Sequence, residues 1–169
     1  MNLKPETLEK IEKLIPRYPT KRSASLPICH LVQEDQGYIS REAMEWIAKK
    51  LDLEPINIYE IVTFYPMLRE KPIGLRHIKV CRTLSCALNG AYEVKKQLEN
   101  ALIGEGLGNS NKDYTIEFVE CIASCGTAPV VQVDDVLHQC IKPDRVGKFA
   151  DMIRGETEQI KLNSRSKVL

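Results

Sequence analysis

Residues 75–86, LRHIKVCRTLSC, join a β-strand pattern to a pair of cysteines. The apolar residues Ile78 and Val80 predict a strand that ends at Cys81. Cys86 follows after four intervening residues, at the start of a segment with helical periodicity. The two cysteines therefore frame the connection between a strand and a helix.

A second strand pattern ends in the same way. Residues 114–129, YTIEFVECIASCGTAP, alternate as a half-buried strand does until Cys121, and Cys125 follows after three intervening residues. The Gly, Thr, Ala and Pro that come next indicate a tight bend. We expect the two strands to be neighbours in one sheet, so that both cysteine pairs emerge at the same edge and four thiolates converge.

The chain changes character near Lys71-Pro72 and divides into two parts. Residues 1–72 predict an N-terminal helical bundle, and residues 73–156 predict a small layer of strands and helices, which makes the fold class α/β (α+β). Residues 157–169 are polar, and we expect a mobile tail. The helical patterns of the first part span residues 5–15, 25–36, 40–51 and 54–65. The second part predicts a strand at 75–81, a helix at 87–103, a strand at 114–121, a hairpin at 130–141 turning near Asp134-Asp135, and a helix at 142–155.

The composition of the 169-residue chain is that of an ordinary globular protein, with 43% hydrophobic and 28% charged residues. Its formal net charge of +1 gives no indication of a nucleic-acid-binding surface. No apolar run approaches the roughly 20 residues that span a bilayer, so we expect no direct membrane insertion. The polar N-terminal sequence has neither signal-peptide nor transit-peptide character, and we expect a cytoplasmic protein.

Six cysteines in a chain expected in a reducing compartment indicate metal binding or redox chemistry rather than disulfides. Thiolates are soft ligands that select zinc, Cu(I) or iron–sulfur clusters. Zinc held by four thiolates is one alternative, and it would make the chain a structural adaptor without a redox role. A dithiol redox enzyme is disfavoured, because neither pair has the Cys-x-x-Cys spacing. Two buried pairs of core cysteines are the remaining alternative.

Small polar residues around the four cysteines favour an iron–sulfur cluster over zinc. Their N–H and O–H groups are able to hydrogen-bond to sulfur, and such bonds tune the reduction potential of a cluster. These residues are Thr83, Ser85, Ser124, Gly126 and Thr127. A Rieske-type cluster needs two histidine ligands, and it is excluded because His30, His77 and His138 lie in neither loop.

Three further features receive a structural interpretation. Cys29 lies in an apolar helical segment and is expected in the core. Cys140 ends a predicted strand; we expect a core residue there too, and it is the first reserve if one of the four ligands is wrong. The glycine-rich segment 104–110, GEGLGNS, lacks the strand–loop–helix context of a phosphate site and predicts a flexible loop.

The chain resembles the family of [2Fe–2S] E subunits of NADH–quinone oxidoreductase (complex I) over residues 20–140. The resemblance rests on VCRTLSC and ECIASCGTAPVVQVDD, which match the family signature Cys-x4-Cys and Cys-x3-Cys-Gly-x-Ala-Pro. The segments LPICHLVQEDQGYIS and IYEIVTFYPML are similar to helical segments of that family. Pro66 departs from the pattern and bears only on where the preceding helix ends, and Arg82 stands at a variable position.

The resemblance implies a thioredoxin-like [2Fe–2S] ferredoxin domain behind the helical bundle. Carried over residue by residue, it makes Cys81, Cys86, Cys121 and Cys125 the ligands of one [2Fe–2S] cluster. The implied role is that of an electron-transfer subunit of an NADH dehydrogenase, without a complete active site of its own. Its implied partner is an NADH-binding flavoprotein of the F-subunit type, whose FMN exchanges single electrons with the cluster.

The same resemblance implies a place in a wider respiratory complex, peripheral on the cytoplasmic side of the membrane. Similar subunits occur in NAD-linked hydrogenases and formate dehydrogenases, and an equivalent role in one of these is an alternative.

Overall fold

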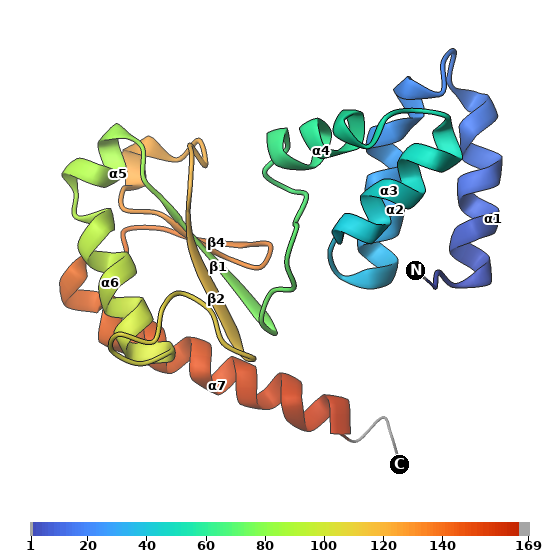
Figure 1. Cartoon of the computed structure of the whole chain (residues 1–169). Coiled ribbons are helices and arrows are strands. Elements are labelled where there is room, and N and C mark those ends of the chain that lie inside the picture. Colours follow the sequence, from blue (N-terminus) through green and yellow to red (C-terminus); the bar gives the residue numbers. More distant parts are fainter. Residues whose placement is uncertain (1, 166–169) are drawn as a thin grey trace. The chain divides into compact units, whose positions relative to one another are not determined.

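The computed structural model describes residues 2–165, with the backbone alone at Ser164 and Arg165 (Figure 1). The chain forms two compact units, which divide between Pro72 and Ile73. The first unit is helical, and the second contains the sheet.

The helical unit is built from short amphipathic helices with defined starts. Pro5 and Pro55 each occupy the first position of a helix, where the missing N–H costs no hydrogen bond. The Ser40 hydroxyl oxygen accepts a hydrogen bond of 3.1 Å from the Ala43 N–H and caps the third helix. The elements are α1 (Pro5–Leu14), α2 (Ser25–Gln36), α3 (Arg41–Leu51) and α4 (Pro55–Phe64), with 3₁₀ turns η1 (Ile15–Arg17) and η2 (Arg22–Ala24).

All four helices contribute fully buried side chains to one core. They are Ile11 of α1, Ile28, Cys29 and Val32 of α2, Ile47 and Leu51 of α3, and Ile58 of α4. Burial of a large aliphatic side chain contributes about 1.5–3 kcal/mol. This shared core explains why helices of some ten residues, which are marginal alone in water, are stable here. The prediction that Cys29 lies in the core is confirmed.

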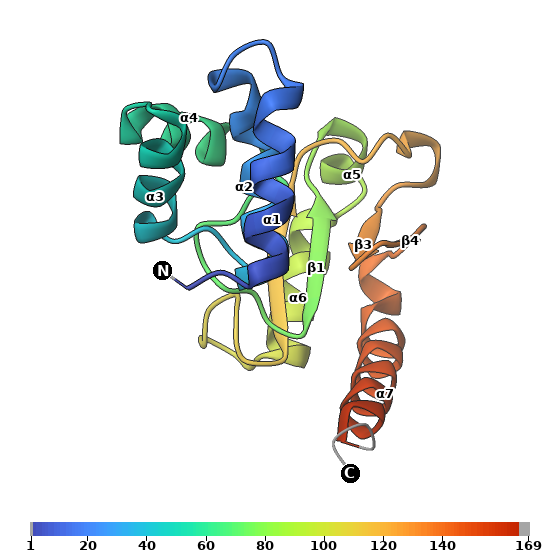
Figure 2. The same ribbon diagram turned by 90° about the vertical axis from the view of Figure 1, so that its right-hand side faces the viewer.

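The second unit contains a four-stranded mixed sheet in the order β2-β1-β3-β4. Its strands are β1 (Arg76–Cys81), β2 (Tyr114–Val119), β3 (Val131–Val133) and β4 (Val136–His138). The helices are α5 (Leu84–Leu88), α6 (Ala91–Leu102) and α7 (Val146–Arg165), with 3₁₀ turns η3 (Cys125–Thr127) and η4 (Pro143–Arg145). Figures 1 and 2 show this unit from two directions.

The central strand β1 pairs in parallel with β2 and antiparallel with β3. Parallel pairing requires a crossover connection, which α5 and α6 provide. The core lies between the sheet and the two longer helices, and includes Ile78 and Ile116 from the strands, Leu98 of α6 and Ile153 of α7. The prediction that the two cysteine-bearing strands are neighbours is confirmed, as is a hairpin that turns at Asp134.

The predicted polar tail of residues 157–169 differs from the structure, because α7 continues to Arg165. The helix passes the expected end at Gly155 since its later turns bind the sheet unit. Glu156 pairs with Arg76 at 3.0 Å, and Lys161 pairs with Asp113 at 2.6 Å. Thr157 is buried between these pairs. Residues 166–169 of that predicted tail lie outside the described residues.

The cysteines differ in burial, and we therefore expect them to differ in reactivity toward alkylating reagents. Burial of the Cys29 thiol raises its pKa to about 12, although a backbone hydrogen bond acts in the opposite direction. Cys121 and Cys125 are exposed. In metal-free folded protein at about pH 8, iodoacetamide is expected to alkylate Cys121 and Cys125 and to leave Cys29 unmodified, because the thiolate is the reactive form. Peptide mass spectrometry measures this, and denatured protein is the control. Alkylation of Cys29 at the rate of Cys121 would contradict the packing of the helical unit.

Asp35 makes the stability of the helical unit dependent on pH. The backbone N–H of Lys4 donates to its carboxylate at 2.8 Å and is the main reason that the pKa of Asp35 lies below its usual value. Burial opposes this shift, while Thr7 and the Lys4 charge add to it. A lowered folded-state pKa stabilises the fold above the unfolded pKa of about 4 and loses that effect as the pH falls through the folded value.

Asp35→Asn is therefore expected to lower the urea midpoint at neutral pH, and the difference from the wild type is expected to shrink in acid. Fluorescence of Trp46, the single tryptophan of the chain, reports on the helical unit. Asp52→Asn is the matched control. The Asp52 side chain is largely exposed, and its carboxylate lies 3.7 Å from Lys21 Nζ, which is too far for a hydrogen bond. Equal midpoints for the Asp35 variant and the wild type at every pH would disprove the role of this carboxylate.

Candidate metal centre

The four predicted ligands lie where two parallel strands end. Cys81 is the last residue of β1 and is in register with Val119, the last residue of β2. Cys121 follows Val119 by two positions. The two cysteine-bearing segments therefore leave the same edge of the sheet side by side, as the sequence predicted.

Cys81 and Cys86 form a buried pair. Cys86 lies in α5, and its side chain hydrogen-bonds to that of Cys81. Both residues are almost completely buried, at 3% and 2% exposure. The Cys81 sulfur is 3.2 Å from the Thr83 hydroxyl oxygen, and the backbone N–H groups of Thr83 and Ile122 also donate to it. Donors from both cysteine segments thus converge on one sulfur.

These contacts move the pKa values of the pair in opposite directions. Burial alone raises the pKa of Cys81, but the hydrogen bonds from Thr83, Ile122 and Cys86 together bring it below its usual value. For Cys86, burial is the largest cause of a raised pKa, which the Val130 N–H partly offsets and the negative charges of Cys81 and Cys125 reinforce. Of the two thiols, Cys81 is therefore the one that loses its proton more readily.

The second pair lies on the connection from β2 to β3 and is exposed. Cys125 begins η3, which lies beside α5, so it is the second-loop cysteine whose charge reaches Cys86. The Ala123 N–H donates to the Cys121 sulfur at 3.2 Å, with Ala123 at a φ of 58°. Among the residues predicted to bond to sulfur, Thr83 does so, whereas the hydroxyl groups of Ser124 and Thr127 bond to each other at 2.8 Å.

The side chains of the four cysteines do not surround a common centre. Within residues 2–165, no three cysteine, histidine or acidic side chains are grouped closely enough to hold a metal ion. The residue types, the shared sheet edge and the N–H donors at Cys81 nevertheless fit a four-thiolate group. The two exposed thiols, Cys121 and Cys125, are the ones that have to turn toward the buried pair to complete it.

An ion pair that the sequence interpretation missed links the two cysteine-bearing segments. The Arg82 guanidinium donates from Nε at 2.9 Å and from Nη2 at 2.5 Å to one carboxylate oxygen of Glu120. Arg82 follows Cys81 directly, and Glu120 precedes Cys121. Hydrogen bonding to Glu120, reinforced by its charge, raises the pKa of Arg82. The parallel register is the signal that identifies this pair, since it places these positions side by side.

Cys140 is the remaining cysteine near the site. It is half-buried rather than fully in the core, and its backbone adopts a φ of 54°. Its N–H donates to the Thr127 carbonyl at 2.8 Å, which holds it beside the second cysteine loop. His77 pairs with Glu117 at 2.6 Å, and the His138 ring contacts Phe149. Neither of these two contacts involves a cysteine.

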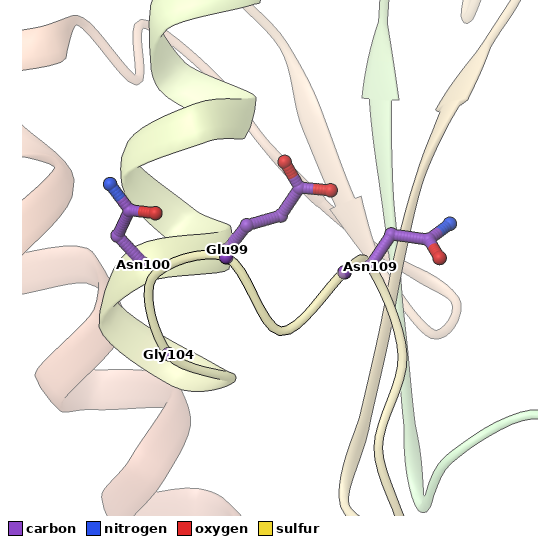
Figure 3. Close-up of a pocket in the computed structure, with 6 residues that line it drawn as sticks. Glu99, Asn100, Gly104 and Asn109 are labelled. Atoms are coloured by element: carbon purple, nitrogen blue, oxygen red, sulfur yellow. The ribbon is translucent and has the colours of Figure 1, made fainter.

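A pocket at the end of α6 lies apart from the cysteines. Figure 3 shows Glu99 and Asn100 on the last turn of the helix and Asn109 on the loop that follows. Glu99 is paired with Lys95. The loop leads from a helix to a strand, the reverse of a phosphate-binding unit, and Gly104, Gly106 and Gly108 supply its positive φ angles. The pocket is thus explained by the turn chemistry of the loop.

In the part of the chain that the structure describes, no helix combines the length and apolar composition needed to cross a bilayer.

Known proteins are similar in sequence to this chain over most of its length. The family model of the thioredoxin-like [2Fe–2S] ferredoxins matches residues 11–154. The E subunit of NADH-quinone oxidoreductase from Rickettsia conorii is 35% identical over 156 residues, covering 89% of this chain and 93% of the relative. The E 2 subunit of the enzyme from Rhizobium meliloti is 33% identical over 147 residues, covering 86% of this chain and 88% of the relative.

A solved structure shares the fold. A chain of the NAD+-reducing [NiFe]-hydrogenase in the H2-reduced state superposes with a TM-score of 0.61 at 14% identity. The match covers 78% of this chain but 22% of the hydrogenase chain, so this protein spans about a fifth of that relative's length. The family match over most of the chain and the identity to E subunits lead to one conclusion. The chain belongs to the thioredoxin-like [2Fe–2S] ferredoxin family, among the E subunits of NADH-quinone oxidoreductase.

Proposed function

We propose that this protein is the [2Fe–2S] electron-transfer subunit of an NADH:quinone oxidoreductase, with Cys81, Cys86, Cys121 and Cys125 as the cluster ligands. The observation that carries the proposal is the convergence of both cysteine segments at one edge of the sheet, with donors from each at the Cys81 sulfur. The family match over residues 11–154 supports it. A bound [2Fe–2S] cluster supplies reversible one-electron chemistry.

The residues of this chain would supply the cluster with thiolate ligands, protection from water and hydrogen bonds to sulfur. The buried Cys81–Cys86 pair lies away from water, and the N–H groups of Thr83 and Ile122 stabilise negative charge on the Cys81 sulfur. Because ligation requires deprotonation, the lowered pKa of Cys81 prepares this sulfur for binding a metal ion. Cys121 and Cys125 complete the ligand set from the second segment.

The partner that we propose is a flavoprotein that binds FMN and NADH. A centre that carries one electron at a time needs a cofactor that accepts the hydride. An exposed apolar surface lies directly beside the cysteines: Leu84 and Leu88 of α5 are 74% and 78% exposed, and Tyr92 at the start of α6 is 57% exposed. Clustered apolar and aromatic side chains of this kind are typical of interfaces. The complex would hold this chain at the cytoplasmic side of the membrane.

An equivalent subunit of an NAD-linked hydrogenase is the second candidate. The fold shared with the hydrogenase chain at a TM-score of 0.61 favours it. The identity to E subunits over most of the chain favours the quinone oxidoreductase over this alternative.

The content of iron and sulfide tests the proposed cofactor. Anaerobically purified protein is expected to hold about two irons and two acid-labile sulfides per chain, with visible absorbance that dithionite bleaches. Cys81→Ser, Cys86→Ser, Cys121→Ser and Cys125→Ser are each expected to lose most of the iron. Cys140→Ser is the matched control and is expected to keep it, because Cys140 lies beside the site without joining it. A colourless protein with about one zinc per chain would refute the electron-transfer role and favour the zinc adaptor.

The exposed surface of α5 tests the proposed partner. Leu88→Glu is expected to weaken binding to the flavin-containing partner by about tenfold or more, since a buried charge at an interface costs at least about 1.4 kcal/mol. Isothermal calorimetry with the purified flavoprotein measures the affinity. Leu107→Glu is the control, because this leucine is similarly exposed, at 71%, but lies on the glycine-rich loop. Equal effects of the two substitutions would argue against docking at α5.

A further inference from the structure

The Arg82–Glu120 ion pair joins the two cysteine-bearing segments directly beyond the ends of β1 and β2. Each member is the immediate neighbour of a proposed ligand, Cys81 in one case and Cys121 in the other. The inference drawn from it rests on the proposed function, because it concerns the cluster that those ligands hold.

Three successive contacts cross from one segment to the other. The Arg82 N–H donates to the Val119 carbonyl at 3.0 Å and extends the β1–β2 ladder one step beyond the strands. The Arg82 guanidinium then donates twice to Glu120. The Ile122 N–H donates to the Cys81 sulfur in the third contact. The ion pair lies in the middle of this row, directly after the last backbone hydrogen bond between the two segments.

The pair also places two opposite charges next to the site. The Arg82 side chain is 50% exposed and that of Glu120 67%, so their attraction is largely screened by solvent. Their charges nevertheless cancel locally: an Arg82 cation without Glu120, or a Glu120 anion without Arg82, would leave one net charge beside the ligands. A [2Fe–2S] cluster with four thiolates becomes more negative on reduction, so a nearby positive charge favours the reduced form and a negative charge opposes it.

We propose that Arg82 and Glu120 are positioning residues that fix the spacing between the two cysteine segments and keep the local charge balanced beside the cluster. Loss of either partner has the same effect on the spacing, whereas the charge left behind has the opposite sign. The two single variants therefore have one effect in common and one effect of opposite sign, which a general loss of stability would not produce.

The first test compares Arg82→Gln and Glu120→Gln in the holoprotein. Both are expected to lose iron to a chelator several-fold faster than the wild type, followed by the decay of visible absorbance. Potentiometric titration is expected to show a lowered reduction potential for Arg82→Gln and a raised one for Glu120→Gln. Arg82→Lys keeps the positive charge but has fewer hydrogen-bond donors. It is expected to keep the wild-type reduction potential and to lose iron at a rate between those of the wild type and Arg82→Gln.

Matched controls come from a second arginine–carboxylate pair of the same unit. Arg154 pairs with Asp151 on α7, and both are about as exposed as the pair at the site. Arg154→Gln and Asp151→Asn are expected to leave iron loss and reduction potential unchanged. Shifts of the potential in the same direction for Arg82→Gln and Glu120→Gln, or iron loss at the wild-type rate in both, would overturn the proposal.

A second test uses the metal-free protein and separates this inference from the proposed function. Hydrogen exchange by mass spectrometry is expected to show several-fold faster exchange over residues 119–125 in Glu120→Gln than in the wild type, with no change in Asp151→Asn. Unchanged exchange in Glu120→Gln would overturn the positioning role. A wild-type protein that binds no iron would instead remove the proposed function, while the exchange result still decides whether the ion pair fixes the loop.

Discussion

The parallel pairing of β1 with β2 is the constraint on which the rest of the second unit depends. Parallel strands need a crossover, and that crossover places α6 on the sheet and α5 beside the end of β1. The same pairing brings the carboxyl ends of both strands to one edge. A slip of the register would separate Cys81 from the second cysteine segment and would turn Ile78 and Val80 out of the core. The core and the site are therefore held by one ladder of backbone hydrogen bonds.

Much of this architecture was predictable, because local pattern and tertiary packing agree in most segments. The alternation in residues 114–121, the proline starts of α1 and α4 and the Ser40 cap are each contained in a few neighbouring residues. The extension of α7 was not predictable in this way. Gly155 is a weak helix signal, and the contacts that hold the helix together beyond it, from Glu156 to Arg76 and from Lys161 to Asp113, join positions far apart in sequence.

The candidate site could be predicted in outline and only partly in its details. Spacing and position on the strands predict the four cysteines as ligands; in the structure Cys81 and Cys86 form a pair, and η3, which begins at Cys125, lies beside α5. Which hydroxyl groups bond to sulfur depends on side-chain rotamers, and here Thr83 does so while Ser124 and Thr127 satisfy each other. The Arg82–Glu120 pair lay within reach of sequence reasoning. It requires only the parallel register, extended by one residue past Cys81 and Val119.

The unequal burial of the two thiol pairs has a consequence for how the protein withstands oxygen. Oxidation of cysteine to sulfenic acid and beyond needs both an accessible sulfur and thiolate character. The pKa of Cys81 is lowered by its hydrogen bonds but its sulfur is buried, whereas Cys121 and Cys125 are accessible. Oxidation of the metal-free chain thus falls on the exposed pair, and the buried pair of proposed ligands is protected from it. A sulfenic acid or a disulfide formed at these surface sulfurs is open to reduction without unfolding the sheet that holds the other two.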